Sequence, residues 1–129
     1  MARRIVSSKS SSSGSPTVRT TVQFSIVLGI NGVMAATPDN LLTMVQRLPD
    51  HAMWQVIAIG RANLSLTAMG LALGGNARAG LEDALYLRKG ELSPGNVPLV
   101  QRAVRLARDL DLGIAGVEET QKLLNLPPR

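Results

Sequence analysis

The chain has 129 residues, no cysteine and a formal net charge of +5. This length is enough for one small domain with a hydrophobic core, and the lack of cysteine excludes disulfides and thiolate metal sites. No apolar run reaches the roughly 18 residues that a membrane-spanning helix needs, so we expect no membrane contact. The lack of cysteine is also consistent with an intracellular protein, and we expect the chain in the cytoplasm.

The positive charge is concentrated near the start of the chain. Residues 1–20 contain Arg3, Arg4, Lys9 and Arg19 and no acid, while the remaining ten Lys and Arg residues are balanced by nine Asp and Glu residues. We therefore expect no basic folded surface, and nucleic-acid binding through this segment is only a minor hypothesis.

Residues 1–20 are predicted to be a disordered, Ser-rich basic tail ahead of a domain at 21–129. The run at 7–16 contains mostly Ser and has too little apolar surface to offset the entropy cost of ordering. The tail is rich in Arg and Ser, as transit peptides are, but it lacks an amphipathic helical pattern and the apolar run of a secretory signal. A non-native leader or a shifted reading frame would explain it equally well.

The rest of the chain alternates strand and helix patterns. We predict strands at 22–28, 54–59 and 76–83, with helices starting at Thr37, near Asn63 or Ser65, at Asn96 and at Glu118. Such alternation with Gly-rich turns predicts parallel strands joined by right-handed crossovers. Three strands would leave an open sheet edge, so the sequence is typical of a piece of a larger α/β protein.

Two of these helices have a clear apolar face. In the first, Thr37 is the expected cap, Pro49 ends the helix, and the apolar stripe consists of Leu41, Leu42, Val45 and Leu48. In the third, which we expect to be capped by Asn96 and stopped by Gly113, the apolar face consists of Val100, Ala103, Val104, Ala107 and Leu110. The opposite face carries Arg102, Arg105 and Arg108, which we expect to be solvated.

The stretch at 76–83 contains the candidate site residues. In a strand, Arg78, Gly80 and Glu82 would share one face, and Asp83 would follow at the strand's end. Charges are rarely buried without a partner, and the carboxyl end of a parallel strand is where α/β folds place their chemistry. The alternative is a structural ion pair, in which Asp83 caps the next helix and Glu82 lies near its positive end.

Several segments together resemble the carboxyl-terminal part of the β-keto acid cleavage enzymes, the family founded on the 3-keto-5-aminohexanoate cleavage enzyme. The resemblance covers roughly residues 21–126 and rests on the segments 56–61, 71–75, 78–83, 86–90 and 99–104. Its most specific part is the run Arg-x-Gly-Leu-Glu-Asp at 78–83.

The resemblance implies a zinc-dependent (β/α)₈ TIM barrel, of which this chain would supply the last three strand–helix units. Members transfer an acyl group from a β-keto acid and acetyl-CoA to give acetoacetate and a new acyl-CoA. By position, Glu82 is similar to the carboxylate ligand of the zinc, Asp83 to the general base, and Arg78 to the residue paired with that base. A carboxylate near a cation is expected to have a lowered pKa.

One departure from the family pattern is decisive. The family's other zinc ligands are a His-x-His pair, whereas the only histidine here is His51, which we expect to be a solvated loop residue. Catalytic zinc needs three protein ligands, and a barrel takes about 250 residues. We therefore expect an enzyme fragment that is inactive unless a complementing chain completes it; the alternative is a non-catalytic remnant or a self-associating domain.

Overall fold

Parallel pairing of two six-residue strands forms the centre of the fold in the computed structural model, which describes residues 22–127. β1 (Gln23–Leu28) lies alongside β2 (Met53–Ala58) in unbroken register, and β3 (Asn76–Ala77) joins the other side of β2. The predicted parallel α/β architecture is thereby confirmed. The predicted tail at 1–20 lies outside the described residues.

α1 (Pro38–Val45) begins as the sequence predicts. The hydroxyl of Thr37 accepts a hydrogen bond from the Asn40 amide at 3.3 Å, and proline occupies the first helical position. The helix ends at Val45, before the predicted stop at Pro49. The predicted stripe is partly wrong, because Leu41 is fully buried whereas Leu42 is exposed.

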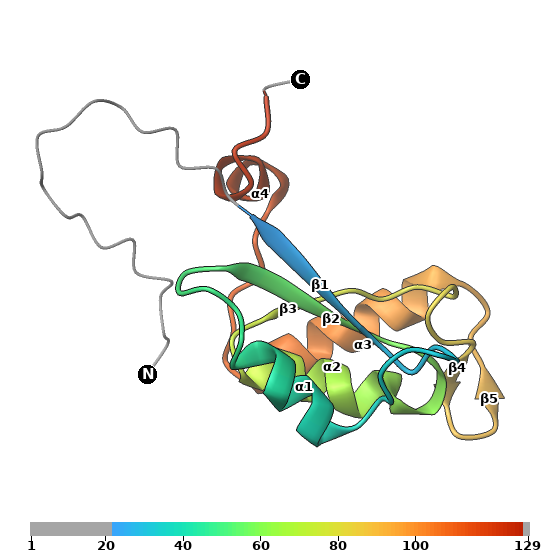
Figure 1. Cartoon of the computed structure of the whole chain (residues 1–129). Helices are drawn as coiled ribbons and strands as arrows, with labels where there is room; N and C mark the ends of the chain where they lie inside the picture. Colours follow the sequence, from blue (N-terminus) through green and yellow to red (C-terminus); the bar gives the residue numbers. More distant parts are fainter. Residues whose placement is uncertain (1–21, 128–129) are drawn as a thin grey trace, which may run out of the picture.

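A short 3₁₀ turn, η1 (Gly60–Ala62), leads into α2 (Asn63–Ala72), and α3 (Asn96–Asp109) packs against α2. α4 (Val117–Leu123) is the last helix of the described residues. α1, α2 and α3 lie on one side of the sheet, whereas α4 lies apart from them near the start of β1 (Figure 1). No helix within residues 22–127 combines the length and the apolar content needed to cross a bilayer.

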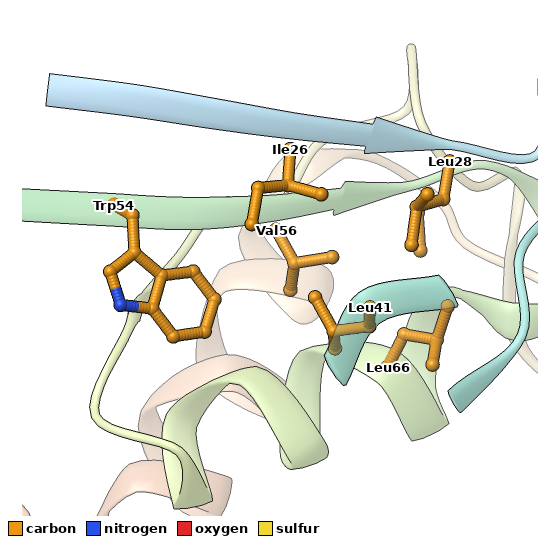
Figure 2. Packing of buried hydrophobic residues seen from close by; sticks show 7 residues of the cluster. Ile26, Leu28, Leu41, Trp54, Val56 and Leu66 are labelled. Carbon is orange, nitrogen blue, oxygen red and sulfur yellow. The ribbon is translucent and has the colours of Figure 1, made fainter. Parts of the chain in front are cut away.

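The hydrophobic core lies between the sheet and the first two helices (Figure 2). Strand alternation turns one set of side chains toward the helices. The buried cluster includes Ile26, Leu28, Trp54 and Val56 of the strands, Leu41 of α1 and Leu66 of α2. The opposite sheet face carries polar residues, where the Gln55 amide donates to the Ser25 hydroxyl at 3.1 Å. One sheet face is therefore a packed core and the other is partly polar.

The third strand is much shorter than predicted. Only Asn76 and Ala77 pair with β2, and the chain then leaves the sheet and turns at 81–83. An antiparallel hairpin that was not predicted follows, formed by β4 (Tyr86–Arg88) and β5 (Glu91–Leu92). Its residues are mostly exposed, so the sequence carried no buried alternation that could have indicated it.

Three expectations for α3 are wrong in whole or in part. Asn96 is not the cap, because Gly95 occupies that position. The predicted apolar face is confirmed at Ala107, which is buried, but Val100 and Leu110 are exposed and Leu99 is buried instead. Within the arginine row, Arg102 is half-buried and donates to the backbone carbonyls of the β4 strand, where tertiary hydrogen bonding outweighs solvation.

Gly75 gives a test of this packing. A Cβ at Gly75 would come within 2.7 Å of the Trp54 ring, which is rigid and buried. We expect Gly75→Ala to lower the free energy of unfolding by about 1–3 kcal/mol through overpacking. Gly113→Ala is the matched control, because nothing lies within 4 Å of the added methyl group. Urea denaturation of the full chain measures both, and equal stability of the two variants would contradict the packing described.

Candidate functional site

The candidate site lies in the turn that follows β3. The Gly80 carbonyl accepts hydrogen bonds from the amides of Asp83 and Ala84, at 3.1 and 3.2 Å. The Asp83 carbonyl in turn accepts from the Gly60 amide at 2.8 Å, just beyond the end of β2. The turn is thereby tied to the carboxyl ends of two parallel strands, the edge where α/β folds place their chemistry.

Arg78 joins the two predicted carboxylates. Its Nε and Nη2 donate to the two oxygens of Asp83, at 2.9 and 3.2 Å, in a bidentate pair. Nη2 also lies 3.1 Å from Oε1 of Glu82. The structure therefore brings together all three predicted site residues. It does so across a turn rather than along one strand face, so the predicted strand alternation of these side chains is wrong.

The structural alternative is only half right. The ion pair between Arg78 and Asp83 exists. However, Asp83 caps no helix, because a hairpin follows it and the next helix begins only at Asn96. Helix capping therefore does not explain why the two carboxylates stand next to each other in the sequence.

The two carboxylates differ sharply in burial. Asp83 is only 4% exposed, whereas the Glu82 side chain is 56% exposed. Burial raises the pKa of Asp83 above its usual value, and this outweighs the lowering by the Arg78 charge; the neighbouring Glu82 charge raises that pKa further. The pairing with Arg78 alone therefore does not lower the pKa of Asp83 below its usual value. A buried carboxylate with a raised pKa is a stronger base than a solvated one.

Gly80 makes room for the Glu82 side chain. A Cβ at Gly80 would overlap the Glu82 carboxylate, which folds back over this residue. Any larger residue would force that carboxylate away from its position beside Arg78. Glycine at this point of the run therefore has a steric reason that the strand interpretation missed.

Asn96 is a second residue whose role sequence reasoning missed. Its side-chain oxygen accepts a hydrogen bond from the Leu81 amide at 2.9 Å. The sequence had singled out Asn96 as a polar residue at a helix start, but no local pattern indicates a contact with a residue 15 positions earlier.

The described residues do not fit a complete zinc site. Among residues 22–127, no group of three or more His, Cys, Asp or Glu side chains is placed to hold a metal ion. His51 is exposed, as expected, and it precedes β2 whereas Glu82 lies beyond that strand's carboxyl end. Six strand residues span about 20 Å, so these two side chains cannot share an ion.

Comparison with known proteins identifies the family. The family model described as beta-keto acid cleavage enzyme matches residues 12–126. The chain belongs to this family. The resemblance inferred from the run at 78–83 is therefore confirmed, and the match begins ahead of the described residues.

Curated relatives agree with this assignment. The chain is 33% identical over 109 residues to the 3-keto-5-aminohexanoate cleavage enzyme of Acetoanaerobium sticklandii, covering 84% of this chain and 40% of that protein. It is 36% identical over 105 residues to the enzyme of the same name from Fusobacterium nucleatum, covering 81% and 38%. It is also 36% identical over 109 residues to the 3-oxoadipate:acetyl-CoA acetyltransferase of Cupriavidus necator, covering 82% and 38%. The chain thus spans no more than 40% of the length of these three relatives.

The raised pKa of Asp83 predicts how stability depends on pH. Since burial disfavours the charged form, ionised Asp83 lowers the stability of the fold at neutral pH, and this cost disappears as the pH falls through the raised pKa to below 3.8. Asp83→Asn keeps the shape without the charge, so we expect it to be at least as stable as the native chain at pH 7. The difference between the two should shrink toward pH 4.

Urea denaturation of both chains at several pH values provides the measurement. The effect of the Asp83→Asn substitution, and not the overall pH dependence of either chain, isolates this carboxylate from the other acids. An Asn variant that is less stable at pH 7, with a loss that shrinks on acidification, would mean that the pairing with Arg78 outweighs burial.

Proposed function

We propose that this chain supplies the carboxylate part of the active site of an enzyme that transfers an acyl group between a β-keto acid and acetyl-CoA. The products would be acetoacetate and a new acyl-CoA. The observation that carries the proposal is the contact of Arg78 with both Asp83 and Glu82 beyond the carboxyl ends of parallel strands. Membership of the β-keto acid cleavage family supports it.

Asp83 is proposed as the general base. Its carboxylate would accept a proton from the bound keto acid, and its burial makes it a stronger base than a solvated carboxylate. Arg78 donates a hydrogen bond to each carboxylate oxygen of Asp83 and so fixes the orientation of the base toward the substrate proton. The arginine also limits the rise in the pKa of Asp83, which keeps the base ionised.

Glu82 is proposed as one zinc ligand. Its carboxylate is exposed and only one of its oxygens contacts Arg78, so it can reach an ion held from outside this chain. The remaining ligands would be a His-x-His pair that this sequence lacks. The described residues do not complete a metal site, so the other ligands would have to come from the rest of the barrel.

The proposed architecture is the last three strand–helix units of a (β/α)₈ barrel. Parallel strands covered by helices on one face support it, since the other face, with Ser25 and Gln55, would line the barrel interior. The first five units would come from residues other than these 129, either in a longer polypeptide that includes them or in a complementing chain. Substrates and full activity would then belong to the completed barrel.

A chimera tests this function. The 38% of the Fusobacterium nucleatum relative that this chain matches is replaced by residues 22–129 of this chain. We expect the chimera to form acetoacetate from 3-keto-5-aminohexanoate and acetyl-CoA, while the isolated chain with added zinc forms none. Acetoacetate released per unit time is the measurement.

Variants of the chimera separate the proposed roles. Asp83→Asn should lower kcat about 10²- to 10⁴-fold, the usual contribution of a general base, while leaving bound zinc unchanged. Glu82→Gln should lower the zinc content found by metal analysis. Glu119→Gln, an exposed acid on α4, is the matched control and should change neither. A folded, zinc-loaded chimera whose activity is unaffected by Asp83→Asn would refute the assignment of the base.

A further inference from the structure

α3 contacts the segment that carries the site at two points. At its first residue, Asn96 accepts the Leu81 amide hydrogen at 2.9 Å. Two turns further along, Arg102 donates to the carbonyl of Leu87 and, at 3.4 Å, to that of Tyr86. Glu82 and Asp83 lie between these two attachment points, and Figure 1 shows the start of α3 close to the segment that follows β3.

The first attachment point is at the site itself. Leu81 immediately precedes Glu82 and Asp83 in the chain. A hydrogen bond that fixes the Leu81 amide therefore also restricts the backbone that carries the two carboxylates. Asn96 does not use its side-chain oxygen to cap its own helix, because Gly95 is the cap and no side chain bonds to the first turn. The Asn96 oxygen is directed at the site turn instead.

The second attachment point belongs to a separate network. Arg102 also donates to the side-chain oxygen of Asn63 at 2.9 Å, and the amide of that residue donates to the Ala58 carbonyl, also at 2.9 Å. Ala58 is the last residue of β2. The hairpin after the site is therefore anchored to the sheet through α3 and α2, independently of Asn96.

We propose that Asn96 is a positioning residue that holds Glu82 and Asp83 in place around Arg78 by binding the Leu81 amide. This inference rests on the proposed function, because Glu82 and Asp83 are the residues proposed to bind zinc and to act as the base. Without the Asn96 oxygen, the turn at 81–83 keeps its backbone hydrogen bonds to Gly80 and Gly60. Among the described residues, it loses the one side chain that accepts a hydrogen bond from its backbone amides. Arg78 then faces two carboxylates whose positions vary.

The test compares three variants of the full chain by NMR. Asn96→Ala removes the acceptor, Asn96→Asp keeps an acceptor oxygen at the same reach, and Val97→Ala is the matched control at the adjacent exposed position of α3. The readouts are hydrogen exchange of the Leu81 amide and the signal of the Arg78 Nε–H, which reports its bond to Asp83. Exchange of β2 amides reports overall stability.

We expect Asn96→Ala to speed Leu81 exchange at least 10-fold and to shift or broaden the Arg78 signal, with β2 exchange unchanged. Asn96→Asp should restore both readouts, and Val97→Ala should alter neither. If Asn96→Ala does not fold, Asn96→Ser replaces it, because serine suits a helix start but its hydroxyl is one bond too short to reach Leu81.

Two results would overturn the proposal. One is unchanged Leu81 exchange in the Ala or Ser variant. The other is faster Leu81 exchange with an unaltered Arg78 signal, which would mean that Asn96 orders the backbone without positioning the carboxylates. Neither readout depends on catalysis, so an inactive chimera would refute the proposed function and leave the role of Asn96 intact.

Discussion

The bidentate ion pair between Arg78 and Asp83 is the interaction on which the described site depends. It can form only because the chain leaves the sheet after two residues of β3 and turns back at 81–83. A continuous strand would have pointed the two side chains to opposite faces. The short third strand is therefore a condition for the site, and the hydrogen bond between Gly60 and Asp83 secures the turn against β2.

Pairing and burial act on Asp83 in opposite directions. The guanidinium stabilises the ionised carboxylate, yet removal of that carboxylate from water costs more than the pairing returns, so its pKa is raised. Burial of the ionised Asp83 therefore weakens the fold at neutral pH, and the raised pKa makes its carboxylate a stronger base. A conflict of this kind is typical of a functional site, where stability is lost in exchange for reactivity. Glu82, which is exposed, carries no comparable cost.

The fold could be predicted where periodicity and turn chemistry agree. Alternating residues in β1 and β2 bury Ile26 and Val56 against the helices, and Thr37 with Pro38 starts α1 as expected. Prediction failed where contacts between segments distant in the sequence decide. The turn at 81–83 is held by hydrogen bonds to Gly60 and Asn96, and the burial of Arg102 depends on a hairpin that no apolar pattern indicated.

That Arg78, Glu82 and Asp83 would lie together could be predicted from the run at 78–83, but their arrangement could not. The contact of Gly80 with the Glu82 carboxylate arises from a turn where a strand was predicted. The hydrogen bond between Asn96 and Leu81 joins residues 15 positions apart, and no local pattern in the sequence indicates such a pairing.

A double-mutant cycle on the full chain tests most directly whether Arg78 and Asp83 act as one unit. Arg78→Met, Asp83→Asn and the double variant are unfolded in urea at pH 7, and the same cycle is run with Glu82→Gln. We predict a favourable coupling of about 1–3 kcal/mol between Arg78 and the buried Asp83, and less than about 1 kcal/mol between Arg78 and the exposed Glu82. A coupling near zero with Asp83, or a larger coupling with Glu82, would contradict the account.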